Sequence, residues 1–109
     1  MGKIFIPLLH LKYKMKISEL EFNQRKVEVE AVVQEIGEVK EFDKFGSPGR
    51  VAATTIKDDS GEVQLTLWNE QIDLVKKGDK IKITNGYVKE WQGEMQLNIG
   101  RYGELEVLK

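Results

Sequence analysis

Residues 58–68 read DDSGEVQLTLW, and this stretch decides the fold class. Its second part alternates in polarity, which is the period-two pattern of a strand with one buried face. The apolar face holds Val63, Leu65 and Leu67, and the other face holds Gln64, Thr66 and Trp68. The preceding letters DDSG are typical of a hairpin turn. A strand from about Arg50 to Lys57 is therefore expected to pair with the strand that ends at Trp68.

The chain before this hairpin predicts a first strand from Lys26 onward. Its alternating apolar positions are Val27, Val29, Ala31 and Val33. A change of parity at residues 36–37 indicates a bulge or a coil where this long strand bends. Residues 43–49, DKFGSPG, are predicted to form a loop because they combine glycine, proline and small polar residues.

The chain after the hairpin predicts a short helix. Asn69 is expected to cap a helix over residues 70–76, and Gly78 is expected to end it. Within this helix, Ile72 and Val75 are expected to face the core. The helix would connect the third strand to a fourth.

The fourth strand is expected to begin at Lys80. Strict alternation from there would bury Lys89, so the pattern requires a bulge near Asn85-Gly86. The bulge turns Val88 inward. It leaves three side chains on the outside of the sheet, which are Tyr87, Lys89 and Trp91.

A turn at Gln92-Gly93 leads to a fifth strand, and residues 101–109 add a short extended piece. The fifth strand has Met95, Leu97 and Ile99 inside and Gln96 and Asn98 outside. Three strands, a helix and two strands form the order of an all-β, five-stranded OB-fold barrel with a short helix between strands 3 and 4. Periodicity alone also allows another small barrel.

With 109 residues, the chain has room for one domain, which we expect to span residues 15–109. Residues 1–14 contain an apolar stretch that is too short for a membrane span or a secretory signal. They are interpreted as a leader or an N-terminal extension. The alternative is a strand or helix that packs on the barrel or on a neighbouring subunit.

The residue inventory argues against an enzyme. The absence of cysteine excludes thiolate metal sites and cysteine nucleophiles, and the single histidine, His10, lies outside the expected domain. No glycine-rich phosphate loop of the known forms is present. Asp58 and Asp59 fit a turn better than a two-carboxylate metal site. We therefore expect no catalytic residues, no metal and no cofactor.

The aromatic residues expected on the outside are the main functional signal. Trp68, Tyr87 and Trp91 are large rings to leave in water, and together they would form a platform on which bases stack. Trp68 has an alternative role as a cover for the edge of the barrel, and the orientation of Tyr87 depends on the bulge. Phe45, in the first loop, is either part of the platform or an anchor for the loop.

Charge is nearly balanced, with 17 Lys and Arg against 18 Asp and Glu, so any anion-binding surface must be a local patch. The cations nearest the expected platform are Lys44, Arg50, Lys89 and Arg101. Arg50 is expected to reach a phosphate or to lie flat on a base. Solvation or a weak ion pair is the alternative for each of these cations.

Four segments carry a resemblance to a known family. They are DDSGEV at 58–63, LTLW at 65–68, KIKI at 80–83 with NGY at 85–87, and QGEMQLN at 92–98. The chain resembles the archaeal single-OB-fold single-stranded DNA-binding proteins, which are related to the OB domains of replication protein A. The resemblance implies that Trp68, Tyr87 and Trp91 stack on bases and that Arg50 is the basic residue opening the second strand.

The expected function is therefore sequence-tolerant binding of single-stranded DNA in replication or repair, by a cytoplasmic, nucleoid-associated protein. Stacking would come from Trp68, Tyr87 and Trp91, with Phe45 as a further candidate. Backbone contacts would come from basic residues, which are Arg50, Lys44 and Lys89. Two alternatives remain open. One is a protein–protein interaction subunit of a replication protein A-like complex, and the other is a binder of single-stranded RNA.

Overall fold

The computed structural model describes residues 15–108. The elements are η1 (Ile17–Glu19), β1 (Val27–Ile36), β2 (Lys40–Lys44), β3 (Ser47–Asp58), β4 (Gly61–Trp68), α2 (Glu70–Leu74), β5 (Lys80–Trp91), β6 (Glu94–Asn98) and β7 (Glu104–Leu108). The predictions made for residues 1–14, including His10, lie outside the described residues. Within the described part of the chain, no helix is long and apolar enough to cross a bilayer.

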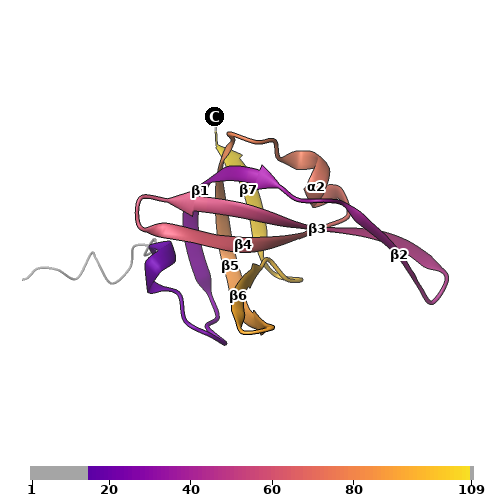
Figure 1. The fold of residues 1–109 in the computed structure, drawn as a ribbon, viewed down its shortest axis with the longest axis horizontal. Coiled ribbons are helices and arrows are strands. Elements are labelled where there is room, and N and C mark those ends of the chain that lie inside the picture. The colour runs from indigo at the N-terminus through magenta and orange to yellow at the C-terminus, as the bar shows by residue number, and fades with distance from the viewer. Residues whose placement is uncertain (1–14, 109) are drawn as a thin grey trace, which may run out of the picture.

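Five strands close into a ring, and Figure 1 shows how they are arranged. The hydrogen-bonded order is β1–β3–β4–β6–β5, and β5 returns to pair with β1. All of these pairs are antiparallel except β4 with β6, which is parallel. Helix α2 connects β4 to β5. This is the predicted OB fold, with the helix in the predicted place.

The core fills the inside of this ring. On β1 the four predicted inward residues are all buried, and they are Val27, Val29, Ala31 and Val33. The pairing of β1 with β3 shifts register between Val33 and Glu35, slightly earlier than the bend predicted at residues 36–37. Just past the bend, a Cβ on Gly37 would lie 2.5 Å from the Ala53 carbonyl oxygen. Only glycine fits so close to the neighbouring strand.

Residues 43–49 do not form the predicted loop. Strands β2 and β3 form a hairpin that extends beyond the ring, and its turn consists only of Phe45 and Gly46, with φ of 55° and 79° (Figure 1). A proline is tolerated at position 48 because, along two antiparallel strands, residue pairs that are joined by hydrogen bonds alternate with pairs that are not. Lys44 and Ser47 form the hydrogen-bonded pair that closes the hairpin. The next pair, Asp43 and Pro48, is therefore not joined by hydrogen bonds, and the nitrogen of Pro48 points away from β2.

Helix α2 is shorter than the predicted 70–76. Ile72 and Val75 are buried as expected, but Asn69 does not cap the helix with its side chain. Its Oδ1 instead accepts a hydrogen bond of 3.0 Å from the backbone N–H of Arg50 on β3. Asn69 therefore links the start of the helix to the sheet and does not cap the helix.

The two ends of the described chain complete the domain. Ile17 and Leu20, in and after η1, are buried and extend the core. The segment is attached to the β3–β4 turn, because the carboxylate of Asp58 accepts a 2.9 Å hydrogen bond from the Ile17 N–H. At the other end, β7 pairs antiparallel with β5, so the predicted final extended piece is a strand of the sheet.

Candidate nucleic-acid interface

The outer surface of β4, β6 and β5 presents a single face. Thr66 on β4 lies opposite Asn98 on β6, and Asn98 lies opposite Tyr87 on β5. Residues directly opposite one another point to the same side of a sheet. Trp68 is the next outward position on β4, and Trp91 lies four residues beyond Tyr87 on β5. We call Trp68, Tyr87 and Trp91 the aromatic face.

The predicted bulge in β5 is confirmed, and it orients Tyr87. Asn85 has a φ of 58°, the pairing with β1 shifts register there, and Val88 is 2% exposed. Tyr87 points outward but is half-buried. Its ring lies against Gly100, where a Cβ would come within 2.7 Å of a ring carbon. Because Gly100 has no side chain, the ring of Tyr87 packs directly against the backbone there and is held in place.

Asn98 was predicted to be on the outside, and the structure shows it to be only 7% exposed. It does face outward, but it is flanked by Thr66 on one side and Tyr87 on the other. Its amide contacts the carbonyl of Gln96 at 3.4 Å. Alternation along a strand determines the direction of a side chain, but neighbouring side chains on the same face determine whether it is covered.

Trp68 is 43% exposed and has a partner that the sequence analysis missed. The ring of Phe42, on β2, meets it edge to face with the centroids 5.8 Å apart. Phe42 in turn lies over Gly49, where a Cβ would collide with the ring at 2.4 Å. Phe42 falls just before the segment predicted to be a loop, so no strand pattern marked it.

Trp91 is 60% exposed at the end of β5. The predicted turn at Gln92-Gly93 follows it, with φ values of 52° and 84°. Trp91 and Glu94 form the closing pair of this hairpin. Lys89 is also exposed and lies on the same side of β5, between Tyr87 and Trp91.

Arg50 is held by an ion pair. Its two terminal nitrogens donate to the Asp73 carboxylate on α2 at 2.7 Å and 3.2 Å, and one also donates to the Asn69 carbonyl. The hydrogen bond and the charge of Asp73 raise the pKa of Arg50, and the same hydrogen bond lowers the pKa of Asp73. The charge of Arg50 is therefore balanced by Asp73, and Arg50 lies one residue before Val51, which pairs with Trp68.

The remaining predicted residues lie at the tip of the β2–β3 hairpin. Phe45 is 95% exposed in the turn, and the hairpin points away from the ring (Figure 1). The backbone of Lys44 pairs with Ser47, whereas its side chain lies outside the described residues. The structure brings Tyr87, Lys89 and Trp91 together on β5, and it puts Phe45 on a separate projection.

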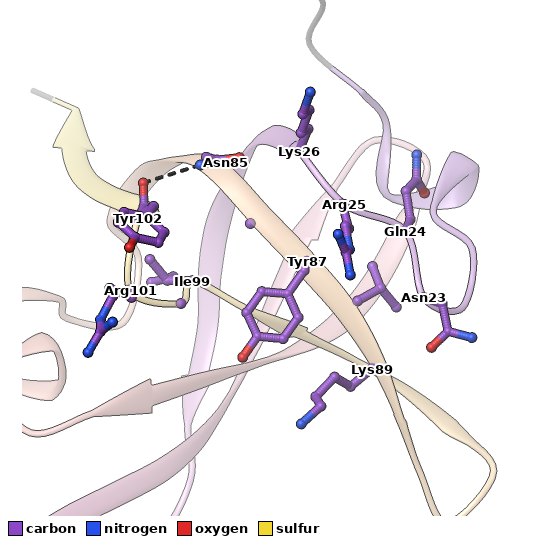
Figure 2. Close-up of a pocket in the computed structure, with 13 residues that line it drawn as sticks. Asn23, Gln24, Arg25, Lys26, Asn85, Tyr87, Lys89, Ile99, Arg101 and Tyr102 are labelled. Atoms are coloured by element: carbon purple, nitrogen blue, oxygen red, sulfur yellow. Dashed lines mark hydrogen bonds between the residues drawn. The ribbon is translucent and has the colours of Figure 1, made fainter.

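A cavity of about 580 Å³ opens around Tyr87 (Figure 2). It contains side chains that the sequence analysis did not select, namely Arg25, Lys26 and Tyr102. Lys89 and Arg101, two of the cations considered from the sequence, also line it. The only available signal for the missed residues was an adjacent pair of cations directly before the first strand.

The Asp58-Asp59 turn has a structural role. Partial burial alone would raise the pKa of Asp58, but hydrogen bonds from the Ser60 hydroxyl and from the N–H groups of Ile17, Ser60 and Gly61 lower it below its usual value. Among residues 15–108, no group of three or more potential ligand side chains is arranged to hold a metal ion. The carboxylate of Asp58 is already used by the turn.

Comparisons with known proteins agree with the fold. A single-stranded DNA binding protein Ssb from Saccharolobus solfataricus is 29% identical over 85 residues, covering 78% of this chain and 57% of that protein. A Replication factor A from Methanothermobacter thermautotrophicus is 31% identical over 97 residues, covering 84% of this chain and 12% of that protein. The chain therefore spans about half of the first relative and a small part of the second.

Solved structures give the same result. The second OB-fold domain of replication protein A from Methanococcus maripaludis superimposes with a TM-score of 0.72 at 32% identity, over 89% of this chain and 96% of that domain. The model of the family described as single-stranded DNA binding protein Ssb-like, OB fold, matches residues 14–107. This family consists of DNA-binding proteins and not of enzymes. The chain belongs to the Ssb-like family of single-stranded DNA-binding proteins with an OB fold.

Proposed function

We propose that this chain binds single-stranded DNA with little sequence preference by stacking bases on Trp68, Tyr87 and Trp91. The observation that carries the proposal is that all three rings lie on one outward face of neighbouring strands. Trp68 and Trp91 are 43% and 60% exposed. Large exposed rings on one face are costly in water unless a ligand covers them.

Stacking accounts for both the affinity and the tolerance of sequence. Each base that stacks on an aromatic side chain contributes about 1–3 kcal/mol, and every base offers a π-face. The positions between the rings are polar, with Gln64 on β4 opposite Gln96 on β6, and Gln96 opposite Lys89 on β5. Their amides and ammonium group suit sugar, phosphate and base edges without selecting one base.

The strand register gives the length of the platform. Trp68 lies two residues from the row that contains Thr66 and Tyr87, and Trp91 lies four residues from it in the other direction. At about 3.3 Å per residue, Trp68 and Trp91 are about 20 Å apart along the strands. A bound strand must therefore be several nucleotides long to contact all three rings.

The biological setting is part of the same proposal. The relatives carry the names Ssb and Replication factor A, and both names fit a role in DNA replication. We extend this role to repair and to a cytoplasmic location with the nucleoid. The net charge of −1 predicts a weaker dependence on salt than that of a strongly basic groove, because fewer counterions are released.

One observation favours a second function, a contact with a protein partner. Phe45, at the hairpin tip, is 95% exposed on a projection that extends beyond the ring of strands. The relative named Replication factor A is much longer than this chain, which spans 12% of it. A protein contact at the hairpin would leave the aromatic face open for DNA, so the two functions are compatible.

Competition in solution tests the proposed function. The full chain is titrated into a fluorescent oligothymidine, and the anisotropy is followed while unlabelled competitors of equal length are added. Single-stranded DNA of several sequences should compete about equally, and duplex DNA should compete far less. Preference for duplex DNA, or no binding of any single strand, would overturn the proposal. Stronger competition by RNA would reassign the ligand to single-stranded RNA.

A further inference from the structure

We propose that the cavity around Tyr87 is a subsite for the DNA backbone, in which Arg25, Lys26 and Arg101 bind the phosphates that flank the base on Tyr87. This inference rests on the proposed function, because it concerns the same bound strand. Figure 2 shows Tyr87 in the middle of the cavity, with Arg25 on one side and Arg101 on the other. We call Arg25, Lys26, Lys89 and Arg101 the basic cluster.

Backbone hydrogen bonds attach one wall of the cavity to β5. The Val88 N–H donates to the Gln24 carbonyl at 2.8 Å, and the Asn23 N–H donates to the Val88 carbonyl at 3.2 Å. Asn23 and Lys26 both have positive φ, 66° and 56°, so the chain turns sharply on either side of this contact. Arg25 is thereby held beside Tyr87, and Lys26 lies at the edge of the same cavity, although both come from a distant part of the sequence.

The opposite wall continues from β6. Gly100, with a φ of 77°, lets the chain turn under the ring of Tyr87. The side-chain amide of Asn85 donates to the Tyr102 carbonyl at 3.3 Å, which ties this segment to the bulge in β5 (Figure 2). Arg101 therefore stands on a segment that is fixed at both sides of it.

The charges of the basic cluster are not balanced within the described chain. No carboxylate from residues 15–108 lines the cavity. None of the four cations forms an ion pair or a side-chain hydrogen bond with any residue from 15 to 108. Other cations in the same range do have carboxylate partners, and these are Lys16, Arg50, Lys80 and Lys82. Uncompensated cations around an aromatic ring suit a phosphate next to a stacked base.

A second cavity, at the base of the β2–β3 hairpin, has the opposite character. Glu41, Asp43 and Glu70 line it together with Arg50. The charge of Arg50 is already balanced by Asp73, so this region repels phosphate. The contrast indicates that the bound backbone runs along β5 and the basic cluster and avoids the hairpin.

The test is the salt dependence of oligothymidine binding. A variant with Arg25→Gln, Lys26→Gln and Arg101→Gln is compared with the unmodified chain over a range of salt concentrations. Each lost phosphate contact on a single strand reduces the log–log slope by about 0.7. We expect a slope smaller in magnitude by about 2, and binding about tenfold weaker or more at low salt. Thermal unfolding of each variant confirms that it folds.

Lys77 provides a control for the removal of one exposed positive charge. It is exposed, precedes the start of β5, and forms no ion pair within the described residues. Lys77→Gln should leave the log–log salt slope unchanged. Arg25→Lys, which retains the positive charge, should also leave the slope unchanged. An unchanged slope in the triple variant, with normal binding, would overturn the subsite and leave the proposed function intact. Failure of the unmodified chain to bind any single strand would overturn both.

Discussion

The ring of Phe42 meets the ring of Trp68 edge to face, at an interplanar angle of 86°. Phe42 is on β2 and Trp68 ends β4, so this contact joins the hairpin to the aromatic face. An edge-to-face pair contributes about 0.5–1.5 kcal/mol beyond the area that it buries. Phe42 therefore fixes the orientation of the Trp68 ring, on which a base is proposed to stack, although Phe42 is not itself predicted to contact a base.

Phe42→Ala is expected to weaken single-strand binding about threefold to tenfold, because Trp68 loses the contact that orients it. In a Trp91→Phe background, the fluorescence of Trp68 alone should shift to longer wavelength. Val39→Ala removes a similarly exposed apolar side chain just before β2 and serves as the control. Equal affinities for Phe42→Ala and the unmodified chain would show that Trp68 needs no support.

Gly100→Ala should weaken binding by displacing Tyr87, because the new Cβ would lie 2.7 Å from the ring. The substitution also strains the backbone at a φ of 77°. Gly78→Ala introduces the same kind of strain at a φ of 95°, with no atom within 4 Å of the new Cβ. Both variants should lose about 1 kcal/mol of stability. Only Gly100→Ala should also lose affinity. A matching loss of affinity in Gly78→Ala would refute the role of Gly100 in holding the ring of Tyr87.

Asp73→Asn should strengthen binding at low salt. The carboxylate of Asp73 neutralises Arg50 and also repels phosphate, so its removal makes the region around Arg50 more positive. If Arg50 then reaches a phosphate, the log–log salt slope should steepen by about 0.7. Glu106→Gln, on β7, makes the same change in net charge. A gain of the same size in this control would reduce the effect to net charge alone.

The stability of the fold should decrease in acid partly through Asp58. Its pKa is lower in the folded state than in the unfolded chain, so the folded state binds fewer protons. The stabilisation by Asp58 is complete when the pH is above the pKa of the unfolded state, which is about 4. It is lost as the pH falls through the lower pKa of the folded state. Asp58→Asn should cost about 1 kcal/mol at neutral pH, and this difference should shrink on acidification. Asp59→Asn, at a surface ion pair, should change unfolding much less.

Most of the fold could be predicted because alternation and turn chemistry are local. The inward residues of β1 follow from the alternation of apolar and polar residues. The bulge at Asn85 and the inward residues of β5 follow because an unbroken alternation would bury Lys89. The β2–β3 hairpin could not be predicted in this way. Whether Pro48 interrupts a strand depends on which neighbour its nitrogen faces, and that depends on the register with β2.

The candidate site was only partly predictable for a similar reason. Strand parity gave the direction of Trp68, Tyr87 and Trp91, and the structure agrees with each direction. The ion pair of Arg50 with Asp73 and the position of Arg25 beside Tyr87 both join residues that are distant in sequence. No local pattern reports such contacts.

The most direct test of the central claim is the quenching of intrinsic fluorescence by oligothymidine. The chain has two tryptophans, Trp68 and Trp91, and both lie on the face that is proposed to bind DNA. Saturable quenching of most of the emission is expected, with roughly half of the quenching lost in either Trp68→Phe or Trp91→Phe. Binding of the oligonucleotide without any quenching would contradict stacking on these rings.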